Sequence, residues 1–113
     1  MNPPNGFSQK VVNLESRTFF LQIQKFENGY FISVTEGTNK IGSMVISLAT
    51  GPTPITTTII PSRTESIFLK LIAERISTRM RGIALVSTFT QKELDPNTAK
   101  ALMSEIMEMV DND

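Results

Sequence analysis

Residues 17–36 read RTFFLQIQKFENGYFISVTE, and this stretch decides the fold. Apolar and polar side chains alternate along residues 17–27 and again along residues 30–36, which is the two-residue period of a β-strand. Asn28 and Gly29 stand between the two runs. Both residue types tolerate the positive φ that a two-residue hairpin turn requires. The stretch therefore predicts an antiparallel hairpin that turns at Asn28-Gly29.

Short β-prone segments lie on either side of this hairpin. Residues 7–13 suit a strand ahead of it, and residues 41–49 and 55–60 suit a second pair of strands. Residues 50–54 (TGPTP) divide that pair, because glycine and proline interrupt a strand. Residues 83–89 (IALVSTF) form a continuous β-prone run of the kind found in buried central strands. We therefore expect about six strands.

Two amphipathic helices are expected in the second half of the chain. Residues 62–65 (SRTE) have the spacing of a capping box, and Gly82 supplies a C-terminal cap. The apolar face of this helix consists of Phe68, Leu69, Ile72, Ala73, Ile76 and Met80. Asp95 suits an N-cap, and Pro96 suits the first position of the next helix. The apolar face of that helix consists of Ala99, Leu102, Met103, Ile106, Met107 and Val110.

The order of these elements defines a fold class. Strands followed by a helix, a strand and a helix make an α+β domain of two layers. We expect a largely antiparallel sheet with both helices on one face. A chain of 113 residues suffices for one hydrophobic core. We therefore expect a single domain at residues 7–113, preceded by a short flexible tail at residues 1–6.

Missing residue types exclude several classes of function. The sequence has no Cys and no His, so disulfides, thiol nucleophiles, Ser-His catalysis and the common zinc sites cannot be built within one chain. Eleven basic and eleven acidic residues give a formal net charge of zero, which argues against a general attraction to nucleic acid or to a membrane. No apolar run approaches the roughly 18 residues of a membrane helix. We expect a soluble, cytoplasmic protein without a metal or cofactor.

The hairpin register separates two faces of the sheet. With Asn28 and Gly29 as the loop, Phe26 lies opposite Phe31, and opposed residues share a face. One face is apolar and suits the core beneath the helices: Phe19, Leu21, Ile23, Ile32 and Val34. The other face mixes aromatic and polar residues: Phe20, Gln22, Gln24, Phe26, Phe31, Ser33 and Thr35.

This second face is too polar for a core and too aromatic for a surface in contact with water. Exposed phenylalanines forgo roughly 1.5 to 3 kcal/mol each and make a protein prone to association. The face therefore predicts a dimer interface in which two sheets pack against each other in a sandwich-like arrangement. Within a single chain, the alternative is that Phe7, Val11 or the N-terminal tail covers the rings.

Several segments resemble the small proteasome-assembly chaperones. These segments are Asn39-Lys-Ile-Gly-Ser43 at a strand entry, Ile55-Thr-Thr-Thr-Ile-Ile60, Leu71-Ile-Ala73 in a helix, and Ile83-Ala-Leu-Val-Ser87 before a terminal amphipathic helix. Residues 40–43 are more similar to the third member of that set, and residues 54–60 to the fourth. The resemblance spans about residues 19–110. The chain departs from the family pattern at Pro61, where glycine is frequent.

The resemblance implies a function. Members of this family are not enzymes; they form homodimers or heterodimers through their sheets, with the helices outside. They bind α-type subunits while the α-ring of the proteasome assembles. By this resemblance we expect a non-catalytic assembly chaperone of the 20S core particle. Its partners would be a second copy of itself, or a paralogue in a heterodimer, and proteasome α-type subunits.

Candidate contacts with such a partner are basic. Lys40 lies at a strand-entry loop, and Arg75 and Arg79 lie one turn apart on a flank of the first helix. This flank is either an ordinary solvated helix surface or a docking surface for an acidic protein. Met103, Met107 and Met109 likewise suit either the core or an adaptable groove, and core is the simpler interpretation at their helical spacing.

Other functions fit the sequence less well. Residues 37–43 (GTNKIGS) have glycines spaced as in a phosphate-binding loop, but a strand follows instead of a helix. Glu93 and Asp95 are close in sequence, but Asp95 is explained as a cap, and no feature marks a catalytic pocket. A dimeric scaffold of the roadblock or longin kind that binds a small GTPase is an alternative, although roadblock domains usually begin with a helix. A nucleic-acid-binding sheet protein is a further alternative.

Overall fold

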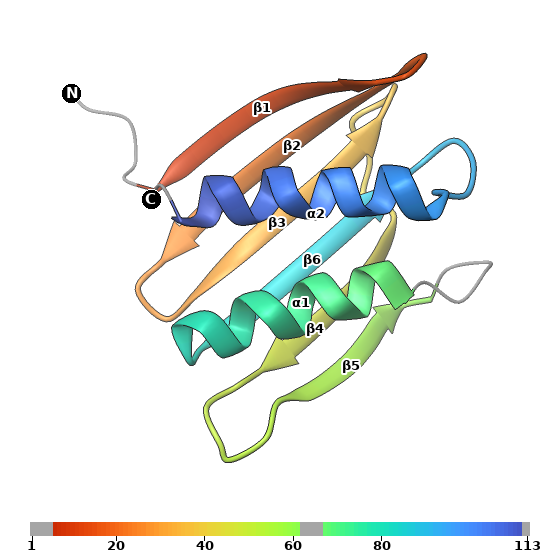
Figure 1. Cartoon of the computed structure of the whole chain (residues 1–113). Coiled ribbons are helices and arrows are strands. Elements are labelled where there is room, and N and C mark those ends of the chain that lie inside the picture. The colour runs from red at the N-terminus through yellow and green to blue at the C-terminus, as the bar shows by residue number, and fades with distance from the viewer. Residues whose placement is uncertain (1–5, 62–66, 112–113) are drawn as a thin grey trace.

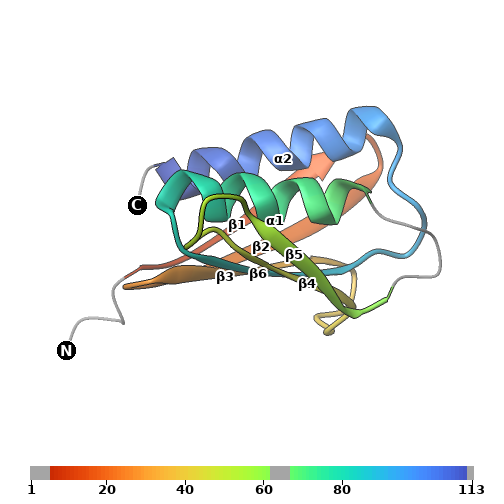
Figure 2. The same cartoon turned by 90° about the horizontal axis from the view of Figure 1, so that it is seen from below.

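Two layers make up the described part of the chain, residues 6–61 and 67–111 of a computed structural model (Figures 1 and 2). A six-stranded sheet forms one layer and two helices form the other. The elements in chain order are β1 (Phe7–Leu14), β2 (Arg17–Phe26), β3 (Gly29–Glu36), β4 (Ser43–Leu48), β5 (Ile55–Ile60), α1 (Ile67–Met80), β6 (Ile83–Phe89) and α2 (Pro96–Asp111).

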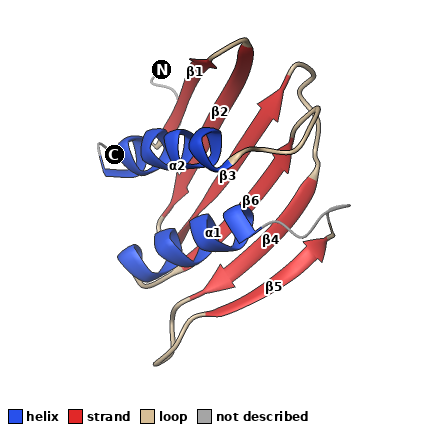
Figure 3. Cartoon of the chain, turned by 45° about the vertical axis from the view of Figure 1, so that its right-hand side comes forward, coloured by secondary structure: helices blue, strands red, loops and turns tan. Residues whose placement is uncertain are grey.

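The strand order in the sheet is β1-β2-β3-β6-β4-β5, so β1 and β5 form the two edges (Figure 3). β3 and β6 are parallel, and the other neighbouring strands are antiparallel. Both helices lie on the same side of the sheet, as Figure 2 shows. The α+β architecture expected from the sequence is therefore confirmed: a largely antiparallel sheet with two helices on one face.

The hydrophobic core lies between the sheet and the helices. The five residues expected on the helix-facing side of the β2–β3 hairpin are fully buried: Phe19, Leu21, Ile23, Ile32 and Val34. They pack with buried residues of both helices, among them Leu69, Ile72, Ala73, Ile76, Leu102, Ile106 and Val110. α1 lies mainly over β6 and β4, whereas α2 contacts β1 and β2. The helices thus cover different halves of the sheet.

The register of the β2–β3 hairpin differs by two residues from the prediction. Phe26 pairs with Gly29 instead of Phe31, and the loop residues are Glu27 and Asn28. Neither Asn28 nor Gly29 has a positive φ, so the predicted Asn-Gly turn is wrong. Because a shift of two residues leaves each side chain on its original face, the assignment of the faces remains correct.

The reason for this shift lies in the neighbouring strand. Gly29 is the first residue of β3 and pairs with Ile83 at the start of the parallel β3–β6 ladder. A Cβ atom at Gly29 would lie 2.3 Å from the carbonyl oxygen of Ile83. Gly29 is therefore needed for close packing against β6 and not for the turn. No neighbour of this kind can be inferred from the hairpin sequence alone.

The C-terminal end of α1 also differs in one detail. The left-handed residue is Arg81, with φ of 54°, and not Gly82. The N–H of Gly82 donates to the carbonyl of Ser77 (3.0 Å) and the N–H of Arg81 to that of Thr78 (3.3 Å), as in a Schellman motif. A Cβ atom at Gly82 would lie 2.5 Å from the carbonyl oxygen of Asn28, so Gly82 is required by a close contact.

The predicted start of α1 cannot be compared, because the capping box at residues 62–65 lies outside the described residues. The start of α2 agrees with the prediction. Pro96 is its first residue, and a carboxylate oxygen of Asp95 accepts a hydrogen bond from the N–H of Thr98 (2.7 Å). β4 begins at Ser43, two residues later than expected, and Ile41 is exposed in the preceding loop. In the described part of the chain, neither helix is long and apolar enough to cross a membrane.

Candidate interaction surfaces

The side of the sheet that faces away from the helices has no second layer of helices or strands among the described residues (Figure 2). The loop between β3 and β4 lies against one part of it, where the N–H of Gly42 donates to the Ser87 hydroxyl (3.2 Å). Partners in the strand ladders share a face, so the members of this surface follow from the register. We call it the open face; it consists of Phe7, Gln9, Val11, Asn13, Thr18, Phe20, Gln22, Gln24, Phe26, Gly29, Phe31, Ser33, Thr35, Ile83, Leu85, Ser87, Phe89, Met44, Ile46, Leu48, Ile55, Thr57 and Ile60.

The seven residues predicted as a dimer interface all belong to the open face, but they differ in exposure. Phe20 and Phe26 are 41% and 54% exposed. The half-buried ones are Gln22, Gln24, Phe31 and Ser33. Thr35 is buried, and its ladder partners are Phe20 and Phe89. Thr35 therefore offers little surface to a partner.

Phe7 and Val11 do not cover the phenylalanine rings of the open face, although the single-chain alternative expected them to. Both belong to β1 and pair with Gln24 and Phe20, on the same face of the sheet. They are 47% and 53% exposed, so they extend the open face instead of covering it. The remaining part of that alternative concerned the N-terminal tail; residues 1–5 lie outside the described residues.

The open face is larger than the sequence predicted. β6 lies beside β3 and contributes Leu85 and Phe89, while β4 and β5 contribute Met44, Ile46 and Ile55. The continuous β-prone run at residues 83–89 predicted a central strand, but which of its side chains join the open face depends on which strands become its neighbours. The open face thus runs across the whole sheet.

The distribution of charge separates the two sides of the sheet. The charged side chains within the described strands are Lys10, Arg17, Lys25 and Glu36. Their ladder partners are Leu21, Leu14, Tyr30 and Phe19, respectively, which places all four on the helix-facing side. Among the residues described, the open face therefore carries no charged side chain. Its polar groups are amides and hydroxyls.

The three basic residues predicted to contact a partner do not form one site. Lys40 lies in the loop between β3 and β4, with its ammonium 5.1 Å from the centre of the Phe89 ring. Because Phe89 belongs to the open face, Lys40 stands at the border of that face. Arg75 and Arg79 lie on α1, on the other side of the sheet, and Arg79 forms an ion pair with Asp111 of α2.

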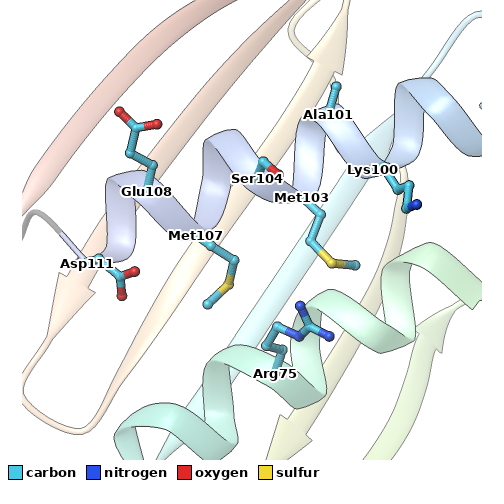
Figure 4. A pocket seen from close by; sticks show the side chains of 8 residues that line it. All are labelled: Arg75, Lys100, Ala101, Met103, Ser104, Met107, Glu108 and Asp111. Carbon is cyan, nitrogen blue, oxygen red and sulfur yellow. The ribbon is translucent and has the colours of Figure 1, made fainter.

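A groove of about 820 Å³ runs between the two helices. It is lined by Arg75, Lys100, Ala101, Met103, Ser104, Met107, Glu108 and Asp111. Figure 4 shows Met103 and Met107 pointing from α2 toward α1, and Arg75 pointing from α1 toward Met103. Both methionines are half-buried and pack against the edge of the core. The interpretation of these residues as core is therefore correct for one side of each side chain, while the other side lines the groove.

A buried ion pair that the sequence did not predict joins Arg17 of β2 to Glu36 of β3. The guanidinium donates to both carboxylate oxygens, at 2.7 and 2.9 Å. It also donates to the carbonyls of Lys92 (3.0 Å) and Glu93 (3.3 Å), and Glu36 accepts a hydrogen bond from the N–H of Gln91 (2.9 Å). This cluster attaches the loop between β6 and α2 to the sheet.

The cluster also shifts both ionisation equilibria. The hydrogen bond from Arg17 lowers the pKa of Glu36 from its ordinary value, and the same bond raises the pKa of Arg17. Glu36 and Lys92 lie 19 and 75 positions from Arg17 in the sequence, so no local sequence pattern predicts these contacts. The pKa of Asp95 is lowered by its bonds to Thr98, which is the behaviour of a helix cap and the opposite of a general acid. Within residues 6–61 and 67–111, no group of three Asp or Glu side chains could hold a metal ion.

Comparisons with known proteins agree with this fold. The family model for proteasome assembly chaperone 4 matches residues 18–88. Among solved structures, the chain is similar to one in the crystal structure of a chaperone complex for yeast 20S proteasome assembly, with a TM-score of 0.69 and 10% identity over 94% of each chain. That likeness shows a shared fold. The comparison with curated proteins returns no match. Since the family model covers more than half of the sequence, the chain belongs to the proteasome assembly chaperone 4 family, a family of proteasome assembly chaperones.

Proposed function

We propose that this protein dimerises through its open face and that the dimer binds α-type subunits while the α-ring of the 20S proteasome assembles in the cytoplasm. Two sheets pack face to face, and the helices lie on the outside. The partner across the interface is a second copy of the chain, and a paralogue with the same kind of face is the alternative. The role requires complementary surfaces and no covalent chemistry. Membership of the chaperone family supports this proposal.

The observation that carries the dimer proposal is the absence of charge from the open face among the described residues. All four charged side chains of the strands lie on the other side, although that side also contains the core. A sheet face in permanent contact with water has no need to exclude Lys, Glu, Asp and Arg. An interface does, because removing an unpaired charge from water costs several kcal/mol.

The composition of the open face suits a sandwich of two sheets. Its aromatic side chains, including Phe20 and Phe26, supply apolar area that water otherwise contacts. Gln22 and Ser33 pair with each other across the β2–β3 ladder in its middle. Amides and hydroxyls can donate and accept hydrogen bonds across an interface without the desolvation penalty of an ion. Such groups fix the register of one sheet on the other.

Contacts with an α-type subunit are then left to the border of the sheet and to the helix layer. Lys40 stands at the border of the open face, beside Phe89. Arg75 points from α1 toward α2 (Figure 4), and Arg79, also on α1, pairs with Asp111. Exposed cations at such positions speed and orient the encounter with an acidic protein surface. We propose these three residues as contacts with the α-type subunit.

Substitution of the open face tests the dimer directly. Phe26→Ser together with Phe31→Ser removes two rings per chain from the face. We expect the dissociation constant of the dimer to rise at least tenfold. Molar mass measured by light scattering after size exclusion, over a dilution series, reports the change. Leu71→Ser is the matched control, because Leu71 is 48% exposed but lies on α1. Equal behaviour of the double variant and wild type would refute the assignment of the face.

A further inference from the structure

The groove between α1 and α2 is a second surface, on the side of the sheet opposite the open face (Figures 2 and 4). A dimer formed through the open faces would leave this groove accessible. It arises because the helices cover different halves of the sheet, α1 over β6 and β4 and α2 against β1 and β2. α2 supplies seven of its eight lining side chains and α1 supplies Arg75. Its volume of about 820 Å³ lies within the range of sites that accept a ligand or a few side chains of a partner.

The floor of the groove is apolar and adaptable. Met103 and Met107 lie on successive turns of α2, and both point toward α1 (Figure 4). Each is half-buried, with the inner side packed on the core. Methionine has an unbranched, polarisable side chain that adjusts to apolar groups of different shapes. Two such side chains next to each other form a surface on which a leucine or phenylalanine side chain can pack.

The two cations at one end of the groove have no ionic partner among the described residues. Arg75 and Lys100 lie on the sides of their helices that border the groove, next to Met103 (Figure 4). Within residues 6–61 and 67–111 neither forms an ion pair, whereas Lys10 pairs with Glu105 and Arg79 with Asp111. The helix layer thus neutralises other cations and leaves these two beside an apolar floor.

From this arrangement we infer that the groove binds a segment of a partner protein in which an apolar side chain lies next to carboxylates, as on the exposed face of an acidic amphipathic helix. The apolar side chain packs on Met103 and Met107, and the carboxylates pair with Arg75 and Lys100. Glu108 and Asp111 line the other end of the groove, and Asp111 is already paired with Arg79. At the Arg75–Lys100 end a basic segment would meet like charges, which suppress the wrong partner. The inference concerns the chemistry of the segment and does not depend on its coming from a proteasome subunit.

Methyl NMR with labelled methionines tests the inference. The probes are three synthetic helical peptides of equal length: one with leucines beside glutamates, one with leucines beside lysines, and one with serines in place of the leucines of the first. The first peptide should shift the methyl signals of Met103 and Met107, while Met44, on the open face, serves as internal reference. The other two peptides should leave all signals unchanged. Substitution of each groove methionine by Leu assigns its signal.

Charge-removing variants complete the test. Arg75→Gln with Lys100→Gln should weaken binding of the acidic leucine peptide about tenfold, since two exposed ion pairs are lost. Lys25→Gln, at an exposed cation on β2, is the control and should bind as wild type does. The inference is overturned if no peptide shifts the groove methionines up to about 1 mM, enough to half-saturate a complex with a Kd of that size. It is also overturned if the lysine peptide binds equally well, or if the signals shift with protein concentration alone, which would indicate a second copy in the groove.

Discussion

Replacement of Glu36 by Gln should destabilise the protein strongly, because it leaves the Arg17 guanidinium buried without an anion. Both side chains are more than 90% buried, and the pair is held by two parallel hydrogen bonds. Gln has nearly the same shape as Glu, so the packing is preserved and the charge is the main change. Its side chain can accept from Arg17 at one atom only, and its NH₂ group would face a donor.

The magnitude follows from this burial. Breaking a buried ion pair by removing one partner costs about 3 to 5 kcal/mol of the free energy of unfolding. For a domain of this size, 1 kcal/mol corresponds to about 4 °C in the melting temperature, so Glu36→Gln should melt at least about 12 °C below wild type. Lys10→Gln breaks the exposed Lys10–Glu105 pair and is the matched control. It should cost less than about 1 kcal/mol.

The pH dependence gives a second signature. The pKa of Glu36 is lowered in the folded protein relative to its ordinary value of 4.5. The stability contributed by the ionised carboxylate is therefore fully present above that value and is lost as the pH falls through the folded pKa. The gap between wild type and Glu36→Gln should be constant near neutral pH and should shrink in acid.

Urea denaturation at a fixed protein concentration, followed by circular dichroism at pH 7 and at pH 3, measures both effects. A loss no greater than that of Lys10→Gln would refute the reasoning about the buried pair. A gap that does not shrink at low pH would refute the assignment of the effect to the Glu36 charge.

Two further predictions concern the helix ends. Asp95→Ala removes the cap of α2 and should cost about 1 kcal/mol of the free energy of unfolding, whereas Glu93→Ala, two residues earlier, should cost close to nothing; urea denaturation compares them. Arg81→Gly relieves the left-handed backbone at the end of α1 and should raise the melting temperature, by an amount corresponding to about 1 kcal/mol, while Arg81→Val should lower it. A lower melting temperature for Arg81→Gly would contradict the backbone argument.

The assignment of strand side chains to one face of the sheet or the other was predictable from sequence, because it depends only on the alternation of residues along each strand. Phe19, Leu21 and Ile23 are buried as expected, although the hairpin register was wrong by two residues. The register was wrong because Gly29 serves the contact with Ile83 on β6, and the insertion of β6 between β3 and β4 is a property of the whole sheet. At this position the packing of Gly29 against β6, and not the turn preference of Asn-Gly, determines the register.

The candidate interaction surfaces were predictable only in part, for the same reason. Phe20 and Phe26 could be assigned to an uncovered face from the hairpin alone. The absence of charge from that face among the described residues depends on the order of all six strands in the sheet, which local sequence patterns do not give. The Arg17–Glu36 pair depends on the backbone of Lys92, which the sequence places far away. Arg75 and Lys100 come from different helices, and they line one groove only because α1 and α2 lie on the same side of the sheet (Figure 2).

Native mass spectrometry of the protein, alone and mixed with unassembled proteasome α-type subunits of the same organism, is the decisive experiment. We expect a dimer in the protein alone and a complex of that dimer with an α-type subunit in the mixture. Charge-free packing of two open faces implies that the dimer persists in salt, whereas the complex with the subunit, which depends on exposed cations, should weaken as salt is added. A protein that stays monomeric at micromolar concentration and forms no complex with any α-type subunit would rule out the proposed role.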